Sequence, residues 1–399
     1  MTRTVLISGA GIAGSVLAYW LSRAGFAPTV VERAPDLRRS GGHAVDLAGV
    51  AVEVVERMGL LSAVQDARVR RDSVVFQRRR GRPLRMPRLS ASVSDRHVEI
   101  QRDDLVSILY DAAAPNAEYV FGDAVAAVGD AEEGVSVEFE KSPPRTFDLV
   151  IGADGLHSRI RRLTFGAEDR FRNDLGAYLS VYSYPNSLGL DREVLSHVCA
   201  DRAAFTYAVD GGRRARALLL FREGRTPGVE LSRAQQLDML RGAFGGIEHL
   251  IPPPLSGAET ADDFYFDSIS QIRMETWSRG RVTLVGDAAY SPGPAVGGGT
   301  ALAVLGAHVL AGELARAGDD HRAAYERTER VMSAPVAQSR KVGPSALAQL
   351  VPRNRVAAWC TPHLMKLLTR LPRSVTLALF SLQGSDKQTL EDFSSETVG

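Results

Sequence analysis

The segment GAGIAG near the amino terminus constrains the fold of this chain more than any other stretch. It gives Gly9, Gly11 and Gly14 the spacing GxGxxG, after the aliphatic run Thr4 to Ile7 and before apolar residues at helical spacing. In such a strand-turn-helix, the first glycine permits the tight turn, the second lets a pyrophosphate approach the backbone, and the third lets helix and strand pack closely. The pattern predicts a Rossmann-like βαβ unit.

The end of the next apolar run carries an acid. Pro28 to Val31 is followed by Glu32, where a carboxylate accepts the two hydroxyls of an adenosine ribose and disfavours a 2′-phosphate. The helix start after the glycines presents free N–H groups to the pyrophosphate. A glycine-rich turn in an unrelated α/β domain is the alternative. We expect an adenine dinucleotide to be held by Gly9, Gly11, Ile12, Ala13, Gly14, Glu32 and Arg33.

A second organised segment, VTLVGDAAYSPGPAVGGG, occupies residues 282–299. After a buried strand, Gly286 lets the backbone turn tightly enough to aim Asp287 at a ligand hydroxyl, such as those of a ribitol chain. The prolines stiffen the loop, and glycines 297–299 leave room for a flat ring beside a helix start that favours negative charge. Two sites so far apart favour a flavin over a simple NAD dehydrogenase, although flexible glycines in an ordinary turn remain the alternative.

The chain between these segments predicts two structural units. Helical patterns at 49–61 and 102–114, and the strand FDLVI at 147–151 before GADG, fit an α/β layer, which resumes at the apolar helix expected from Thr300 to Ala315. Strand patterns between turn clusters predict an inserted antiparallel sheet. We expect a discontinuous FAD-binding domain in residues 1–173 and 268–345, a substrate-binding β-sheet domain in 174–267 and a C-terminal helical segment in 346–399.

Composition excludes several classes of partner. The formal net charge of +1 gives no field for nucleic acid, and the basic run Arg78 to Arg82 is interpreted as a solvated loop. The two cysteines, Cys199 and Cys360, form no CxxC motif, which suits a reducing compartment and argues against a metal site. No run of about 18 consecutive apolar residues predicts a membrane segment. We expect a cytoplasmic protein.

Three segments in order resemble those of the single-component FAD-dependent aromatic hydroxylases, the family typified by para-hydroxybenzoate hydroxylase. They are the GxGxxG with its acid, a DG motif in DLVIGADGLHSRIR, and a GD motif in GRVTLVGDAA followed by PGPAVGGG. The resemblance covers about residues 3 to 330. It implies the fold of para-hydroxybenzoate hydroxylase, with FAD bound between the motifs and with the inserted sheet as the substrate domain.

The resemblance also implies roles for particular residues. Asp154 and Gly155 would shape a loop that serves both FAD and the passing nicotinamide, Asp287 would hold the ribitol, and Arg102 of IQRDDL would lie near the FAD phosphates. Tyr290 stands where many relatives have histidine, and Gly298 where a glutamine is common, which puts the family's usual ring contacts in doubt. The residues expected around the flavin ring and ribitol are Gly286, Asp287, Pro294, Gly297, Gly298 and Gly299.

The segment GGHAVDL, Gly41 to Leu47, is similar to a loop of the tetracycline-inactivating branch that borders flavin and substrate. That similarity favours a polycyclic, polyketide-like or antibiotic substrate, and a small phenol remains an alternative. The C-terminal helices, with Trp359, Leu364, Leu367 and Leu368, are expected to brace the domains of a monomer, or else to bury a dimer seam. Candidate substrate residues, each of which could instead be an ordinary surface or core residue, are His43, Asp46, His197, Tyr207 and Arg213.

The family's reaction would have NADPH or NADH reduce FAD, after which O2 forms a flavin C4a-hydroperoxide that hydroxylates an electron-rich carbon. The protein would shield this species from water and hold the substrate in reach. The sequence does not single out a catalytic base or the preferred nicotinamide. The alternatives are a flavin-dependent halogenase, disfavoured because Trp277 stands alone in ETWSRG, a reductase or dehydrogenase of the same fold, and a non-catalytic FAD- or ligand-binding protein.

Overall fold

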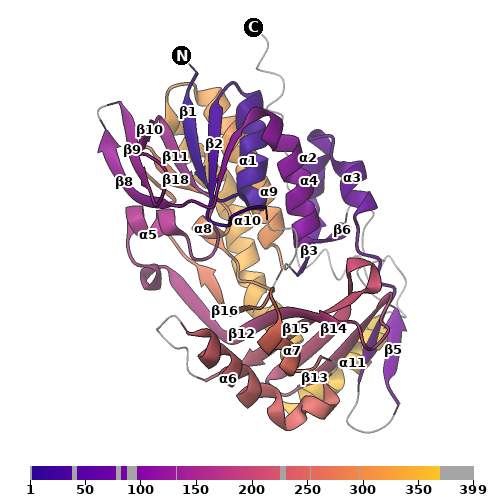
Figure 1. Ribbon diagram of the computed structural model, residues 1–399. Helices are drawn as coiled ribbons and strands as arrows, with labels where there is room; N and C mark the ends of the chain where they lie inside the picture. The colour runs from indigo at the N-terminus through magenta and orange to yellow at the C-terminus, as the bar shows by residue number, and fades with distance from the viewer. Residues whose placement is uncertain are drawn as a thin grey trace.

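The computed structural model describes residues 2–37, 43–77, 82–87, 97–131, 133–224, 231–251, 253–295 and 297–368. A parallel sheet with its helices forms the upper half of the molecule in Figure 1, and a largely antiparallel sheet forms the lower half. Two parts of the chain that are far apart in sequence build the upper half, as expected from the two glycine-rich segments.

The upper sheet is parallel except at one edge, and its strands lie in the order β17-β18-β11-β1-β2-β7. Most of its residues are buried, as in α/β sheets whose two faces are covered by helices. The expected strand at 147–151 is divided, because β10 ends at Phe147 and β11 begins at Leu149. The strands are β1 (Thr4–Ser8), β2 (Ala27–Glu32), β7 (Glu118–Phe121), β11 (Leu149–Gly152), β17 (Ser278–Arg279) and β18 (Val282–Leu284).

The helices of this half confirm most of the periodic patterns. The pattern at 49–61 gives two helices rather than one, because Gly59 adopts φ 74°, which ends the first. The apolar α9 is long enough to cross a membrane, but 72% of its most apolar window is buried in the protein core. The helices are α1 (Ile12–Arg23), α2 (Val50–Arg57), α3 (Leu61–Asp66), α4 (Arg102–Ala113), α5 (Arg159–Phe165), α8 (Asp287–Tyr290), α9 (Gly299–Ala317) and α10 (His321–Leu350).

The lower sheet confirms the expected inserted antiparallel sheet and extends it. Its strand order is β16-β12-β15-β14-β13-β4-β5. Strand β4 pairs with the edge of β13 and β5 pairs with β4, although the sequence placed both in the first domain. Pairing covers the backbone groups of that edge, which would otherwise be exposed. The strands are β4 (Ser73–Phe76), β5 (Leu84–Pro87), β12 (Arg172–Pro185), β13 (Glu193–Cys199), β14 (Arg202–Val209), β15 (Arg214–Arg222) and β16 (Tyr265–Ile272).

Smaller elements complete the structure. Helices α6 (Arg233–Phe244) and α7 (Ser256–Thr260) cover the lower face of the lower sheet (Figure 1). The two-stranded antiparallel sheet of β3 (Ala44–Ala48) and β6 (His97–Gln101) lies between the two halves. A further sheet, peripheral to the upper half, consists of β8 (Val125–Ala131), β9 (Gly134–Phe139) and β10 (Arg145–Phe147).

The two halves are connected by α10 rather than by the last helix. Leu347 of α10 and the following Val351 pack against Leu179 and Leu220 of the lower sheet. Helix α11 (Arg355–Leu368) lies beside β13 of the lower sheet in Figure 1, and Trp359, Leu364 and Leu367 are 57–60% exposed there. Because they are exposed, these side chains do not brace the two halves in the way the sequence suggested. The side chain of Leu368 and residues 369–399 lie outside the described residues.

Candidate active site

Three adjacent strands of the upper sheet end in register. Ser8 of β1 pairs with Gly152 of β11, which in turn pairs with Leu284 of β18. The GxGxxG segment, the DG motif and the GD motif each follow one of these strands. Because ligands of open α/β sheets bind at the carboxyl ends of the strands, this register places all three motifs at one site.

Close packing explains why the first motif needs glycines. A Cβ on Gly9 would lie 2.6 Å from the carbonyl oxygen of Ala153, and one on Gly14 would lie 1.9 Å from the carbonyl oxygen of Gly9. Gly11 is the N-cap of α1, so Ile12 and Ala13 open the helix with backbone N–H groups that no side chain caps. A Cβ on Gly11 would lie 3.9 Å from Nη2 of Arg102. The helix start and this arginine therefore suit a pyrophosphate.

Glu32 lies beside this turn and is fixed by two backbone groups. Its Oε2 accepts a hydrogen bond from Ala10 N at 3.0 Å, and its Oε1 accepts one from Ala34 N at 2.9 Å. Each carboxylate oxygen has two lone pairs, so both oxygens can still accept a ribose hydroxyl. Arg33, the next residue, is exposed. The carboxylate is thus oriented before any ligand binds.

The segment 153–158, called the DG loop here, is shaped from within by Asp154. That carboxylate accepts hydrogen bonds from Ser158 Oγ at 2.5 Å, Arg159 N at 2.8 Å and Ile160 N at 3.0 Å, so it caps the start of α5. Burial raises the pKa of Asp154, and these hydrogen bonds oppose the rise. Gly155 adopts φ 81°, a conformation that favours glycine. The position of both residues agrees with a loop-shaping role.

Arg161, which the sequence analysis did not single out, ties the DG loop to the GD motif. Its guanidinium is fully buried, donating from Nη1 to the carbonyl of Ala288 at 2.9 Å and from Nη2 to that of Leu156 at 2.6 Å. Nη2 also lies 2.7 Å from a carboxylate oxygen of Glu168. The signal in the sequence was a basic residue inside SRIRR, but the pattern does not show which of its arginines turns inward.

The GD motif packs against both glycine-bearing helices. A Cβ on Gly286, where φ is 67°, would lie 3.1 Å from the Cβ of Ala13 and 3.6 Å from that of Ala303. Asp287 follows, with Oδ1 3.6 Å from the Cβ position of Gly299 at the start of α9. Burial raises the pKa of the Asp287 carboxyl, while Ser291 and the charge of Arg102 oppose the rise. A half-buried acid held in this way is a suitable acceptor for ligand hydroxyls.

The loop before α9 is built on left-handed backbone. Gly297 has φ 85° and Gly298 has φ 83°, and a Cβ on Gly298 would lie 2.7 Å from Ser339 Oγ. Pro294 precedes them and is half-buried, and Val296 lies outside the described residues. The side chain of Tyr290 is buried against Trp277, with ring centroids 4.6 Å apart. Tyr290 therefore fills the core, whereas Gly298 leaves an open backbone at the site.

The described residues fit an FAD. The start of α1 and Arg102 suit its pyrophosphate, Glu32 suits its ribose, and Asp287 suits its ribitol. The glycines before α9 leave space for a flat ring. The three motifs follow strands of the upper sheet, and Arg102 follows β6, so backbone elements place each group and the site is largely formed in advance.

One face of the lower sheet points toward these motifs, and we call it the roof face. Strand alternation and register put apolar side chains over one part of it and polar ones over another. Its apolar part packs near Ala295 of the loop before α9 and near the end of α10. The residues of the roof face are Leu179, Val181, Ser183, Phe205, Tyr207, Arg216, Leu218, Tyr265 and Asp267.

Arg216 is the buried cation of the roof face. It is 3% exposed and donates from Nε to Ser183 Oγ at 3.1 Å and from Nη1 to Gln101 Oε1 at 3.4 Å. Its Nη2 lies 3.4 Å from an oxygen of Asp263. Sequence reasoning missed this residue and named Arg213, which is exposed in the turn before β15.

Two of the predicted substrate residues meet near Arg216. The backbone N–H of Ala44, next to His43, lies 3.5 Å from the Tyr207 hydroxyl. Burial and the charges of Arg102 and Arg216 lower the pKa of His43 to about 4, so its ring is neutral at pH 7. The Arg71 guanidinium lies 3.5 Å from the centroid of the Tyr207 ring. His43 is thus placed between a cofactor residue and the roof face.

The other predicted substrate residues lie elsewhere. His197 pairs with Ala204, which packs with the core beneath α6, so its side chain is on the opposite face of the sheet. Asp46 is exposed on β3 and forms an ion pair with His97 at 2.9 Å. Gly41 and Gly42 of the predicted substrate loop, and most of the basic run 78–82, lie outside the described residues.

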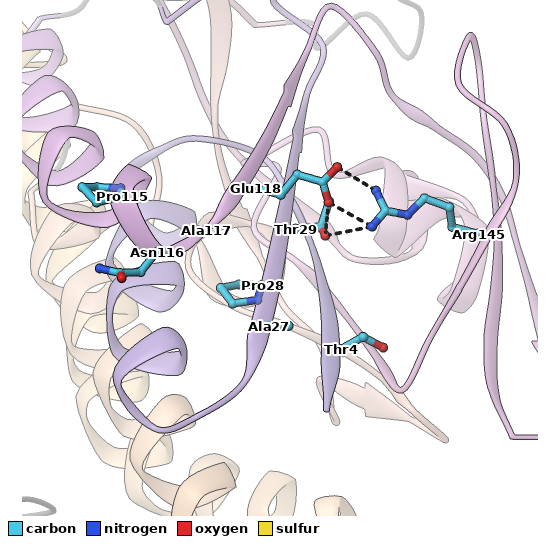
Figure 2. A pocket seen from close by; sticks show the side chains of 9 residues that line it. All are labelled: Thr4, Ala27, Pro28, Thr29, Pro115, Asn116, Ala117, Glu118 and Arg145. Carbon is cyan, nitrogen blue, oxygen red and sulfur yellow. Dashed lines mark hydrogen bonds and ion pairs between the residues drawn. The ribbon is translucent and has the colours of Figure 1, made fainter. Parts of the chain in front are cut away.

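A surface hollow of about 350 Å³ lies at the opposite ends of the strands. Figure 2 shows Glu118 and Thr29 facing Arg145 at its rim, with an Arg145 Nη2 to Glu118 Oε2 distance of 2.9 Å. Thr4 and Ala27, which also line it, start β1 and β2. Since ligands in such sheets bind at the carboxyl ends, this hollow is not part of the cofactor site.

Comparisons with known proteins agree with this site. Residues 2–172 match the FAD binding domain family. An uncharacterized protein of Mycobacterium tuberculosis, Rv1260, is 42% identical over 81% of this chain and 88% of its own length. A flavin-dependent monooxygenase from an unknown prokaryotic organism is 37% identical, over 86% of this chain and 89% of its own. The crystal structure of tetracycline destructase Tet(55) superposes with TM-score 0.82 at 32% identity, covering 96% of this chain and 97% of that one. The chain belongs to the flavin-dependent monooxygenases, and FAD is its cofactor.

Proposed function

We propose that this protein uses NADPH or NADH and O2 to hydroxylate an aromatic or polycyclic, antibiotic-like substrate. The observation that carries the proposal is the roof face, which sets apolar Leu179, Val181 and Leu218 beside polar Tyr207 and Arg216, facing the three FAD motifs. A flat ring with an acidic oxygen at one end fits this division of surfaces.

Different parts of the protein would have different roles in the reaction. FAD, when bound, supplies the electron transfer and the oxygen chemistry. The start of α1 with Arg102 would bind the pyrophosphate, and Asp287 would hold the ribitol. The apolar part of the roof face would exclude water from the ring, and the DG loop would receive the passing nicotinamide.

The polar part of the roof face would orient the substrate. Arg216 is held by Ser183 and Gln101, so it presents a fixed positive charge to an enolate or phenolate oxygen. His43, neutral because of its lowered pKa, would add a hydrogen bond without adding a second charge. An anionic oxygen makes the ortho and para carbons of a phenolate, or the α-carbon of an enolate, more electron-rich, which favours hydroxylation at those carbons.

A structural relative supports the proposed size of the substrate. Tet(55) is described as a tetracycline destructase, and it shares the whole length of the fold. This supports a polycyclic substrate over a small phenol. We further propose a cytoplasmic monomer, and we propose that it binds neither nucleic acid nor membrane.

The test mixes the purified yellow protein with NADPH or NADH in air, with and without candidate aromatic and polyketide compounds. We expect one class of compound to stimulate nicotinamide oxidation and to gain one oxygen atom by mass spectrometry. Arg216→Met should raise the KM for that compound about tenfold or more, because a charged hydrogen bond is lost. The matched exposed variant, Arg213→Met, should leave KM unchanged. Nicotinamide oxidation without oxygen insertion for every compound would refute the proposal.

A further inference from the structure

His157, in the DG loop, links two parts of the protein that are distant in sequence. Its Nδ1 lies 2.9 Å from Oε1 of Glu168, in the short helix η3 (Glu168–Arg170) that follows α5. Its Nε2 lies 2.8 Å from Oδ2 of Asp267, in strand β16 of the lower sheet. One side chain therefore connects the DG loop of the upper half with the roof face of the lower half.

The connection continues from Asp267 toward the cofactor residues. The Tyr265 hydroxyl donates to Oδ2 of Asp267 at 2.8 Å, the same oxygen that His157 contacts. Burial, and then the charge of Asp267, raise the pKa of Tyr265 well above its ordinary value, and Arg102 and Asp287 are close enough to act on it as well. Tyr265, which is 40% exposed, is thus within electrostatic range of both residues assigned to FAD.

We propose that His157 is a positioning residue, which holds the DG loop against β16 and, through Asp267, fixes Tyr265 against the bound FAD. Asp154 and Arg161 already anchor the loop to α5 and α8. His157 supplies the anchor on the side of the roof face. The proposal rests on the assignment of the DG loop to the FAD site.

The ion pairs of His157 with Asp267 and Glu168 require that its imidazole ring is protonated. Hydrogen bonds to Asp267 and then to Glu168 raise the pKa of His157 to about 10. The titratable or charged groups around the ring are Glu168 and Asp267, with Tyr265 behind Asp267, and with Arg161 and Arg172 behind Glu168 at 2.7 and 3.9 Å.

The sign of the pH effect follows from the direction of the shift. A folded pKa above the unfolded 6.5 means that the stabilisation is complete below 6.5 and is lost as the pH rises toward 10. More than half of the ring is exposed, at 55%, so water screens part of the attraction. FAD affinity should therefore be level between about pH 6 and 8 and should fall as the pH approaches 10.

The experiment titrates FAD into apoprotein and measures Kd by flavin fluorescence from pH 6 to 10. We expect His157→Gln to raise Kd at pH 7.5 about five- to tenfold, because a neutral amide replaces a charged donor. His157→Arg should return Kd to within about twofold and should remove the decline toward pH 10, because a guanidinium can contact both carboxylates and does not titrate. The matched control is Arg159→Gln, which removes a cation two positions further on, at the start of α5. Arg159 pairs with Glu140 instead, so Kd should stay unchanged.

Two results would overturn the proposal. One is a Kd for His157→Gln within about twofold of wild type, and the other is equal weakening in His157→Arg, which would indicate ring packing rather than an ionic link. Should His157→Gln fail to fold, Tyr265→Phe removes one hydroxyl only and is expected to shift the visible spectrum of bound FAD at an unchanged Tm; an unchanged spectrum counts against the proposal. These measurements do not depend on substrate turnover. Failure of the positioning role of His157 can therefore be told apart from failure of the proposed hydroxylation.

Discussion

Replacing Gly14 by alanine tests whether the GxGxxG segment is required by packing or is merely flexible. Gly14 is the third residue of α1, and in an unobstructed helix the change would stabilise by about 0.5–1 kcal/mol. Here the new Cβ would lie 1.9 Å from the carbonyl oxygen of Gly9, far inside the 3.4 Å of ordinary contact. Both sides of this clash are backbone, so the overpacking cost should reach about 3 kcal/mol. The net loss is about 2 kcal/mol.

In a chain of 399 residues a loss of this size should lower Tm by about 2–3 °C, and displacing the Gly9 carbonyl should also reduce FAD occupancy. The matched control is Gly242→Ala in α6, where nothing lies within 4 Å of the added Cβ and where Tm should stay level or rise. Thermal unfolding and the flavin absorbance of the purified variants measure both effects. If Gly14→Ala matched Gly242→Ala in Tm and bound flavin normally, the role of this glycine in helix-strand packing would be refuted.

Two further substitutions separate the ends of the cofactor site. Asp287→Asn should weaken FAD about tenfold, because the ribitol loses a charged acceptor. Burial raises the pKa of the Asp287 carboxyl in the folded protein, so its ionisation opposes folding once the pH exceeds the ordinary pKa of an aspartate. The Asp287→Asn apoprotein should therefore have a higher Tm than the wild-type apoprotein at pH 7, and a lower Tm would contradict this. Glu32→Ala should weaken FAD and also lower Tm, because two backbone N–H groups lose their acceptor. Unchanged FAD affinity in a calorimetric titration of Glu32→Ala would place the ribose elsewhere.

The parts of the site that can be read from the sequence are those where function dictates local backbone geometry. Gly9 and Gly286 adopt positive φ at tight turns after buried strands, and Gly14 has no room for a side chain. Such requirements leave a fixed spacing of glycines and acids, which can be read without knowing the fold. In the sheet, β18, β11 and β1 are neighbours and run parallel. Their carboxyl ends therefore share one edge, where the three motifs meet.

The roof face could not be predicted in the same way, because strand residues differ in role only through register. Shifting a strand by one position moves every side chain to the opposite face. The sequence offers Arg213, Arg214 and Arg216 within four positions, and only pairing with Tyr207 and Ser183 shows that Arg216 turns toward the motifs. His197 failed as a candidate for the same reason, since its partner Ala204 belongs to the opposite face.

This difference has a physical consequence for how substrate specificity can change in such a protein. The FAD motifs combine backbone conformation with ligand contact, so most substitutions there disturb both, as the predicted effect of Gly14→Ala illustrates. Side chains such as Leu218 and Phe205 project from a sheet whose backbone pairing does not depend on their identity, and both are only partly buried. Exchanging them alters the surface offered to a ring while the cofactor site stays intact. The roof face can therefore diverge among relatives that all retain the same flavin chemistry.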